Sequence, residues 1–330
     1  MDNSSLLKFN ENGIFCAQGG FYIDPWKPVK KAIITHGHSD HARFGNENYL
    51  CHNHSIPILK QRLGQVSVEG LPYRESIRIN GVNVSFYPAG HLLGSAQVRV
   101  EYKGEVWGVS GDYKLEPDPI AEDFEPVSCD TFITECTFGL PVYNWPAPAL
   151  VMNQIQDWWV ANQQQDKTSV LSTYSLGKAQ RILELLDESV GPIYVHGAID
   201  NLNRIYREAG FLQKKVSYLS DKIPKSELRG AMVLAPPSAI GSSWTKRLQP
   251  ASIGVVSGWM MLRGSKRRQN VDRGFILSDH ADWAGLNEAI KSTSANRVIC
   301  THGYTAVFSE WLKSIGYDAH EEKTFFEEES

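Results

Sequence analysis

The sequence predicts an α/β protein, because short strand patterns and amphipathic helical patterns share its 330 residues. Strand patterns bounded by Gly, Pro, Asn or Asp dominate as far as residue 137. Beyond that point strand and helix patterns alternate, which is typical of βαβ units and a mostly parallel sheet. A chain of this length is expected to fold as one or two domains.

The first domain is expected to comprise residues 1–140 and 262–330. Its early strand patterns occur at 13–25, 30–35, 82–89, 96–112 and 130–137. After residue 262 the predicted order is strand, helix, strand, helix, at 274–280, 283–293, 297–303 and 304–316. We expect the strands that end at His280 and His302 to lie side by side, so that the last part of the chain rejoins the first domain.

Residues 141–261 are expected to form the second domain, because a Pro-rich connector at 139–150 marks a change in the pattern. A helical pattern at 153–164 follows the connector. Strand and helix patterns then alternate, at 169–175, 175–188, 191–197, 199–210, 231–237 and 251–258. This alternation predicts a mostly parallel sheet in the second domain.

Composition is that of an ordinary globular protein, with 42% hydrophobic and 21% charged residues. The first residues do not resemble a signal peptide, and no run reaches the roughly 18 apolar residues of a membrane span, so a cytoplasmic protein is expected. Five cysteines form no CxxC pair, which favours buried reduced thiols. The net charge of −4 means that a nucleic-acid partner would need a local basic patch.

The segment from Ile33 to Ala42 carries the strongest chemical signal. An apolar strand ends there, and His36, His38, Asp40 and His41 follow within six positions. We expect Asp40 and His41 to open a helix, so that one loop serves two ions about 3.5 to 4 Å apart. A lone His is usually a satisfied polar residue, but this spacing favours metal ligands.

Three further ligand-type residues each follow a predicted strand, namely His91, Asp112 and His302. Each alone would be read as a turn residue. Together with the HxHxDH segment they predict the rest of a two-ion site, in which the two oxygens of Asp112 bridge the ions.

This set resembles the metallo-β-lactamase superfamily and, more narrowly, its β-CASP nucleases, which include RNase J, the cleavage and polyadenylation endonuclease, Artemis and Pso2. The residues that match the motifs are Asp24, His36, His38, Asp40, His41, His91, Asp112, Glu135, His280 and His302. The likeness covers nearly the whole chain. It implies an αββα sandwich with an inserted β-CASP-type α/β domain.

The resemblance also implies the ligand sets of two divalent transition-metal ions. The first set is His36, His38, His91 and Asp112, and the second is Asp40, His41, Asp112 and His302. Artemis and Pso2 lack the His that corresponds to His302, which argues for two well-held metals here. Zn²⁺ suits the His-rich set, and Mn²⁺ or Fe also fits the mixed nitrogen and carboxylate ligands.

Residues 262–286, together with TYSLGKAQRILELL, most resemble bacterial ligase-associated DNA exonucleases, which are encoded beside an ATP-dependent DNA ligase and a helicase. The implied function is a DNA exonuclease of DNA repair that hydrolyses phosphodiester bonds with a metal-bridged hydroxide. An RNA-processing nuclease of the RNase J type remains the alternative. A small-molecule metallo-hydrolase would share the metal set but would not need the inserted domain, Glu135 or His280.

Three residues are expected to support catalysis without being principal ligands. His280 is the candidate proton donor to the leaving oxygen, as the matching family His is. Glu135 would orient His280, although orienting a metal ligand is an alternative role. Asp24 is expected to hold the metal loop by accepting a hydrogen bond.

Nucleic-acid contacts are expected from a basic run and one helix start, at Arg263, Lys266, Arg267, Arg268 and Lys178. Arg pairs well with phosphates, and a helix N-terminus favours anions. A merely solvated basic loop remains an alternative. His52 and His54 imitate a metal pair, but we expect them to be solvated turn residues.

Overall fold

The computed structural model describes residues 5–262 and 271–324. The chain divides into two compact units, of which one comprises Met1–Tyr143 and His280–Ser330 and the other Asn144–Asp279. Within the described residues, no helix is long and apolar enough to cross a membrane. All five cysteines are buried and free, as the sequence predicted.

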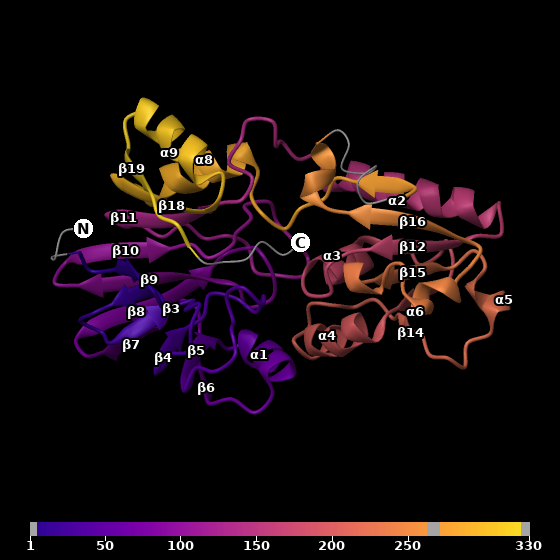
Figure 1. Ribbon diagram of the computed structural model, residues 1–330, viewed down its shortest axis with the longest axis horizontal. Helices are drawn as coiled ribbons and strands as arrows, with labels where there is room; N and C mark the ends of the chain where they lie inside the picture. The colour runs from indigo at the N-terminus through magenta and orange to yellow at the C-terminus, as the bar shows by residue number, and fades with distance from the viewer. Residues whose placement is uncertain (1–4, 263–270, 325–330) are drawn as a thin grey trace. The chain divides into compact units, whose positions relative to one another are not determined.

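Two sheets form the centre of the first unit (Figure 1). The first sheet has the order β1 (Lys8–Asn10), β2 (Gly13–Cys16), β3 (Phe21–Ile23), β4 (Lys31–Ile33), β5 (Asn48–His52) and β6 (Val68–Leu71). The second has the order β19 (Asp318–Glu321), β18 (Arg297–Gly303), β11 (Thr131–Cys136), β10 (Glu105–Val109), β9 (Ala96–Tyr102), β8 (Val82–Pro88) and β7 (Ser76–Ile79). Buried residues of both sheets, among them Phe21, Phe86 and Trp107, make one apolar cluster between them.

Helices cover the outer faces of these two sheets. Leu59 of α1 (Ser55–Leu63) packs with Tyr49 and Cys51 on the first sheet. Helices α8 (Trp283–Thr293) and α9 (Thr305–Ser314) cover the second sheet, where buried residues of both helices share a cluster with β11 and β18. The layers are therefore helix, sheet, sheet and helix, which confirms the predicted sandwich.

The second unit contains a six-stranded sheet in which every pairing is parallel. Its order is β14 (Ser217–Tyr218), β13 (Ile193–Val195), β15 (Met232–Ala235), β12 (Thr168–Ser172), β16 (Ala251–Val256) and β17 (Arg273–Phe275). Strands β12, β13 and β15 are buried at every position, as parallel strands covered on both faces should be. The predicted parallel α/β insert is confirmed.

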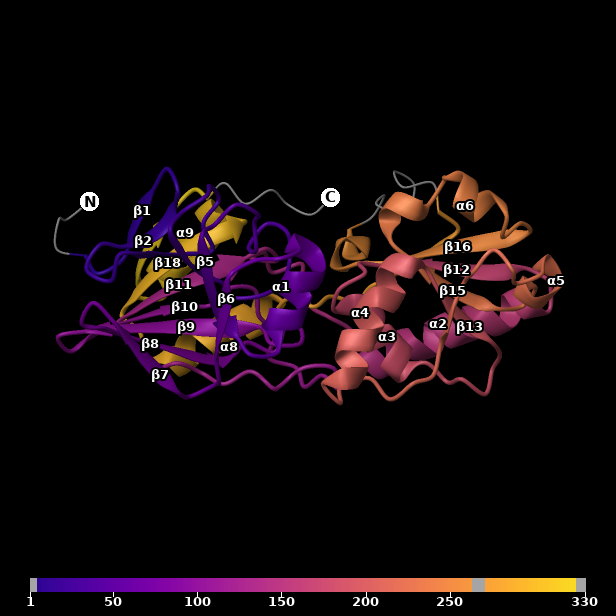
Figure 2. The ribbon, with the colours of Figure 1, turned by 90° about the horizontal axis from the view of Figure 1, so that it is seen from below.

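Helices alternate with these strands (Figure 2). They are α2 (Pro148–Gln163), α3 (Lys178–Leu185), α4 (Gly197–Glu208), α5 (Lys225–Leu228) and α6 (Ser243–Lys246), with single 3₁₀ turns at Pro237–Ala239 and Gly258–Met261. Helix α3 begins after β12, and it positions two cations discussed below.

Three local predictions differ from the structure. The strand before His280 was expected beside β18, but β17 pairs with β16 in the second unit, and β18 lies between β11 and β19. Because β17 belongs to the sheet of the second unit, that unit extends to Asp279. The sequence analysis had placed the return to the first domain at residue 262. Asp40 and His41 lie in a turn and do not open a helix.

Candidate metal centre

The loop after β4 carries four of the predicted ligands, and Asp24 lies behind it. Asp24 Oδ1 accepts a hydrogen bond from the Thr35 amide at 2.8 Å. Its other oxygen lies 2.7 Å from His41 Nδ1. Because Nδ1 of His41 contacts the Asp24 carboxylate, its other nitrogen, Nε2, faces the remaining carboxylates of the site. Nε2 lies 3.5 Å from Asp40 Oδ2 and 3.4 Å from Asp112 Oδ1. Such a carboxylate partner fixes the tautomer and ring direction that a metal ligand needs.

Two arginines, which the sequence analysis did not single out, hold carbonyl groups of the same loop. Arg62 of α1 donates from Nη1 to the carbonyl oxygen of Gly37 at 2.6 Å. Arg43 donates from Nε to the carbonyl oxygen of Asp40 at 3.3 Å. Gly37 lies between His36 and His38, so that Arg62 fixes the backbone between two predicted ligands. Their signal in the sequence is weak, because an Arg on an ordinary helix has many possible partners.

Seven predicted ligands meet in groups that could hold metal ions. The groups are His36 with His38, His91 and Asp112, His36 with Asp40 and His41, and His41 with Asp112 and His302. In each group one ligand atom per residue lies within 4.8 Å of the others. The structure thus brings together all seven residues that were expected to hold the metals.

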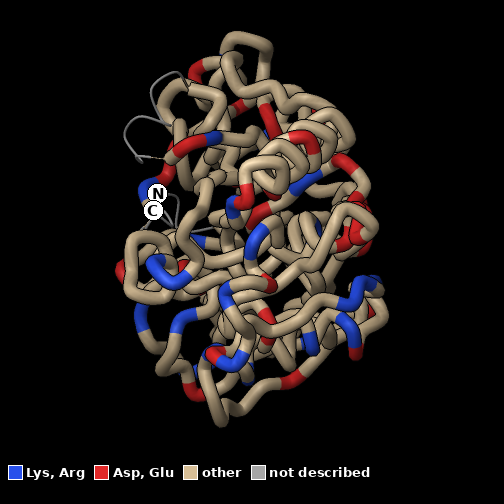
Figure 3. Tube along the Cα trace, turned by 90° about the vertical axis from the view of Figure 1, so that its right-hand side faces the viewer, with Lys and Arg blue, Asp and Glu red and all other residues tan. Residues whose placement is uncertain are grey.

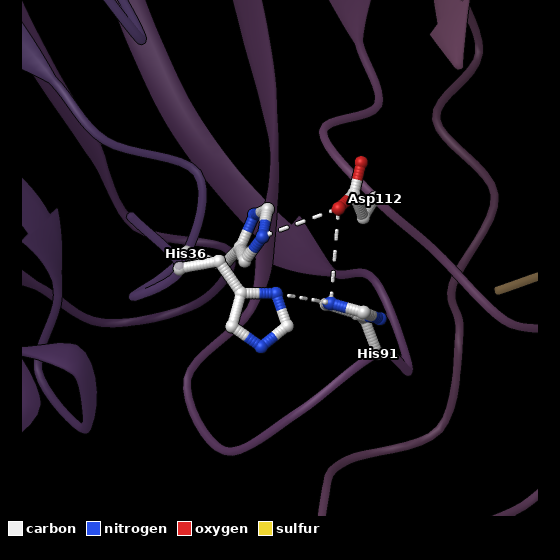
Figure 4. A group of neighbouring side chains, drawn as sticks. His36, His91 and Asp112 are labelled. Carbon is white, nitrogen blue, oxygen red and sulfur yellow. Dashed lines mark hydrogen bonds and ion pairs between the residues drawn. The ribbon is translucent and has the colours of Figure 1, made fainter. Parts of the chain in front are cut away.

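Asp112 belongs to two of these groups, the one with His36, His38 and His91 and the one with His41 and His302. Its Oδ2 is 3.3 Å from His36 Nε2 and 3.8 Å from His91 Nε2. Its Oδ1 faces His41 Nε2 at 3.4 Å. Figure 4 shows His36 and His91 directed toward the carboxylate. A carboxylate with one oxygen toward each donor group has the arrangement of a bridging ligand.

Backbone conformation helps to bring Asp112 and His302 into the site. Gly111 has φ of 58°, and a Cβ there would lie 2.6 Å from the side chain of Thr35. The chain before Asp112 can therefore approach the metal loop only because residue 111 has no side chain. His302 itself has φ of 59°, which is uncommon for a residue other than glycine and is typical of functional sites.

Buried polar atoms show that these residues fit cations. His36 Nε2, Asp40 Oδ1 and Asp112 Oδ1 are all buried and make no hydrogen bond. Leaving such an atom without a hydrogen bond costs on the order of 1 to 3 kcal/mol. Imidazole nitrogen and carboxylate oxygen are the donors that divalent transition metals bind, so ions bound in these groups would satisfy the three atoms.

The electrostatics of the site also favour positive charge. Burial lowers the pKa of His41, but the surrounding carboxylates raise it by more, so that it lies well above its ordinary value. Burial raises the pKa of Asp112, yet the neighbouring imidazoles, His41 first, bring it well below its ordinary value. Burial holds the pKa of His36 well below the usual range. The lowered pKa of Asp112 keeps its carboxylate ionised and the lowered pKa of His36 keeps its imidazole neutral, as metal ligands must be. The raised pKa of His41 shows that the surrounding carboxylates favour a positive charge at its position.

His280 and Glu135 lie beside the metal ligands. His280 Nδ1 is 2.9 Å from Glu135 Oε1 and 3.0 Å from Oε2. Its Nε2 is 4.0 Å from Asp112 Oδ2, and the ring is about one fifth exposed, at 19%. Glu135 also accepts hydrogen bonds from the amide of Tyr113 and from Thr137. Glu135 is thus fixed by its neighbours and orients the imidazole of His280.

Of the five residues predicted to contact nucleic acid, the structure describes only Lys178. Arg263, Lys266, Arg267 and Arg268 lie outside the described residues. Lys178 is described, and its Nζ is 3.5 Å from Asp279 Oδ2 and 4.7 Å from the centre of the Tyr174 ring. Its charge is therefore matched by a carboxylate of the protein itself.

The expectation that His52 is solvated is wrong. His52 is 5% exposed, and its ring stacks on Tyr73 with the ring centres 3.5 Å apart. His54 is half-buried and lies 3.2 Å from Glu122. The sequence could not show this, because Tyr73 is distant along the chain.

Several proteins are similar to this chain, although no protein-family model matches it. A "Probable DNA ligase" of Opitutus terrae is 31% identical over 317 residues, which cover 95% of this chain and 30% of that protein. "Endoribonuclease YSH1" of Saccharomyces cerevisiae is 24% identical, over 72% of this chain and 38% of that protein. "Cleavage and polyadenylation specificity factor 73" of Drosophila melanogaster is 22% identical, over 72% and 42%.

This chain thus spans between 30% and 42% of the length of these curated relatives. Among solved structures, a protein of unknown function from Enterococcus faecalis superposes with a TM-score of 0.59 and 12% identity, over 88% of this chain and 78% of that chain. At this identity the match speaks for the fold alone.

Fold and site together define a protein of the metallo-β-lactamase fold, with two packed sheets between helices and a His- and Asp-rich centre at the strand ends. Within that fold, the chain resembles the β-CASP nucleases and is related to Endoribonuclease YSH1 and cleavage and polyadenylation specificity factor 73.

Proposed function

We propose that the chain is a metal-dependent phosphodiesterase that cleaves nucleic acid, and more narrowly a DNA exonuclease of DNA repair. The observation that carries the proposal is the position of Asp112, which is shared by two of the donor groups and lies beside the His280–Glu135 pair. A small-molecule hydrolase needs the donor groups, but it has no need of a fixed proton donor next to them.

Each residue then has a defined task. The three histidines His36, His38 and His91 with Asp112 would hold one ion, and Asp40, His41, Asp112 and His302 would hold the other. Bound divalent ions supply Lewis acidity, which activates water and offsets the charge that develops on the phosphate. His280 delivers a proton to the leaving oxygen, and Glu135 keeps its ring directed to that position. Asp24 and Arg62 keep the metal loop in shape.

Zinc is the proposed metal, because five of the seven ligands in the two sets are histidines. Manganese or iron would also fit the mixed donors. Metal analysis of protein reconstituted with each ion separates these choices.

DNA is the proposed substrate, and the relative of Opitutus terrae supports this choice. That protein is named a probable DNA ligase, and the likeness spans 95% of this chain but only 30% of that protein. A region similar to this chain is therefore part of a longer protein that is named a DNA ligase. We therefore propose that this chain works beside an ATP-dependent DNA ligase. The resemblance to ligase-associated exonucleases adds a helicase to the proposed partners.

RNA is the second candidate substrate, because the two relatives from yeast and fly include one named an endoribonuclease. The overall charge of −4 attracts neither polymer. Figure 3 shows Lys and Arg interspersed with Asp and Glu along the described trace. Affinity must then come from local phosphate contacts, which both polymers offer.

One digestion experiment tests the proposal. Matched DNA and RNA strands, labelled at either the 5′ or the 3′ end, are incubated with the metal-reconstituted protein. A DNA exonuclease releases mononucleotides from DNA and leaves RNA largely intact. Faster cleavage of RNA would instead favour the YSH1-like activity, and cleavage of neither strand would refute the nuclease proposal.

Asp40→Ala is the matched control for this digestion. Asp40 belongs to a donor group, and it does not lie in the apolar cores between or outside the sheets. We expect the variant to lose at least about 10³-fold in cleavage rate, because the site loses a ligand. Its circular dichroism spectrum should match that of wild type. Retained cleavage would show that a contaminating nuclease or another site is responsible.

A further inference from the structure

A group of charged side chains in the second unit holds the residue that immediately precedes His280. Asp279 Oδ2 is 3.5 Å from Lys178 Nζ, and Asp279 Oδ1 is 3.7 Å from Arg181 Nη1. The side chains are little exposed, at 4% for Lys178, 2% for Arg181 and 5% for Asp279. Both cations belong to α3, where they are three positions apart and therefore share one side of the helix.

Arg181 also fixes the main chain one residue earlier. Its Nη1 donates to the carbonyl oxygen of Ser278 at 2.7 Å. One guanidinium thus contacts two consecutive residues, through a backbone hydrogen bond and an ion pair. Hydrogen bonds and ion pairs that are shielded from water are less weakened by solvent than exposed ones.

The chain is anchored on the other side of His280 as well. The amide of Ala281 donates to the carbonyl oxygen of Tyr113 at 2.7 Å. Asp282 accepts a hydrogen bond from the Gly285 amide at 2.8 Å and so caps α8. The backbone is thus held on each side of His280, before it by α3 of the second unit and after it by residues of the first unit.

We propose that Asp279 is a positioning residue, held by Lys178 and Arg181, that fixes the backbone in front of His280 and thereby keeps the imidazole on Glu135. This inference rests on the proposed role of His280 as proton donor. It assigns to Lys178 a purpose other than a phosphate contact, because the nearest opposite charge is Asp279. A reacting group displaced by about 1 Å can lose on the order of 10²-fold in rate.

Asp279→Asn tests the inference, because it keeps the size of the side chain and removes its charge. We expect a 10- to 100-fold lower kcat on DNA, an unchanged metal content and a KM within about twofold of wild type. On bis(p-nitrophenyl) phosphate, whose leaving group needs no added proton, the rate should stay at the wild-type level. The Lys178→Met variant keeps the ion pair between Arg181 and Asp279, so its kcat on DNA should fall less than that of Asp279→Asn.

A double-mutant comparison separates positioning from general damage. In a His280→Ala background, Asp279→Asn should cause no further loss on DNA, because a residue that acts only through His280 has nothing left to position. Additive losses would overturn the inference. Asp187→Asn is the matched control, since it makes the same substitution at an exposed Asp of the second unit whose carboxylate accepts a hydrogen bond from the Ser189 amide, and it should keep the wild-type rate.

A spectroscopic readout keeps the inference testable without any nuclease assay. The imidazole N–H signal of His280, identified by its loss in His280→Ala, should broaden or shift in Asp279→Asn and stay unchanged in Asp187→Asn. An unaltered signal in Asp279→Asn would overturn the positioning role. An altered signal in a protein that cleaves neither DNA nor RNA would refute the proposed function and leave the positioning role standing.

Discussion

Asp112 differs from the other ligands because its two oxygens face different partners. Oδ2 lies toward His36 and His91, and Oδ1 lies toward His41. A histidine offers one nitrogen to a metal, whereas a carboxylate can bind two ions at once. This difference would let one Asp at the end of a strand serve two of the donor groups, the one with His36, His38 and His91 and the one with His41 and His302.

His280 and His302 are expected to differ in what their removal changes. His280→Ala should keep the metal content and slow cleavage by about 10² to 10⁴-fold, the usual contribution of a general acid. His302→Ala should lower the metal content as well as the rate, because His302 shares a donor group with His41 and Asp112. Elemental analysis beside a cleavage assay makes the comparison. If His280→Ala lost metal to the same extent, it would be a ligand and not an acid.

His52 should make the folded protein sensitive to acid. Burial lowers its pKa from 6.5 to about 4. Between these values the unfolded chain binds a proton at His52 and the folded chain does not, so the free energy of unfolding falls as the pH falls through this window. Above pH 6.5 the group contributes no pH dependence.

Urea unfolding of wild type and His52→Gln at pH 7, 5.5 and 4.5 measures this effect. The variant has no group to protonate at this position, so it should lose less free energy of unfolding than wild type on acidification. Parallel losses in the two proteins would show that His52 is protonated in the folded state as readily as in the unfolded state.

At the scale of elements, the loop after β4 depends on a helix that carries no ligand. Arg62 of α1 donates to the carbonyl oxygen of Gly37 across 25 positions of the sequence. The Arg62→Met variant should therefore weaken metal binding, by about tenfold, which is the lower end of the range for residues that support ligands. The dissociation constant is measured by competition with a chelating dye.

Lys60→Met is the control for this prediction. Lys60 lies on the same helix and is exposed. The substitution removes the same charge and nearly the same volume without touching the loop, so metal affinity should stay at the wild-type value. Equal weakening in both variants would point to a change in α1 as a whole, and would contradict the specific role of Arg62.

The sequence predicts where the strands end, but it does not predict which strands lie next to each other in a sheet. The runs that end at His36, His91, Asp112 and His302 are short, apolar and followed by turn residues, so the position of each ligand after a strand is a local property. Which strand pairs with which is a long-range property. The strand before His280 has the same pattern as β18, yet β17 pairs with β16.

The candidate site was predictable for a related reason. Ligands at fixed spacing, such as His36, His38 and His41, leave a pattern in the sequence that few other structures need. Arg62, Lys178 and Asp279 leave none, because a charged residue finds its partner only in the folded chain. His52 is the converse case, a metal-like pattern whose burial against Tyr73 has no local signal.

At the scale of the whole molecule, one unit is made from both ends of the chain and the other is an insert of Asn144–Asp279. The insert returns at Asp279, directly before His280, so the proposed acid lies at the junction in the sequence. Every predicted metal ligand belongs to the first unit. Metal binding should therefore depend on the first unit, whereas the proposed positioning of His280 draws on α3 of the insert.

Metal stoichiometry tests the central claim most directly. Protein stripped with a chelator is reconstituted with Zn²⁺, Mn²⁺ or Fe²⁺, freed of excess ion and measured by elemental analysis beside Asp112→Ala treated in the same way. We predict about two equivalents per chain in wild type with at least one of these ions, and a loss of both in the variant, because both proposed ligand sets include Asp112. One equivalent or fewer in wild type with every ion would contradict the two-metal centre.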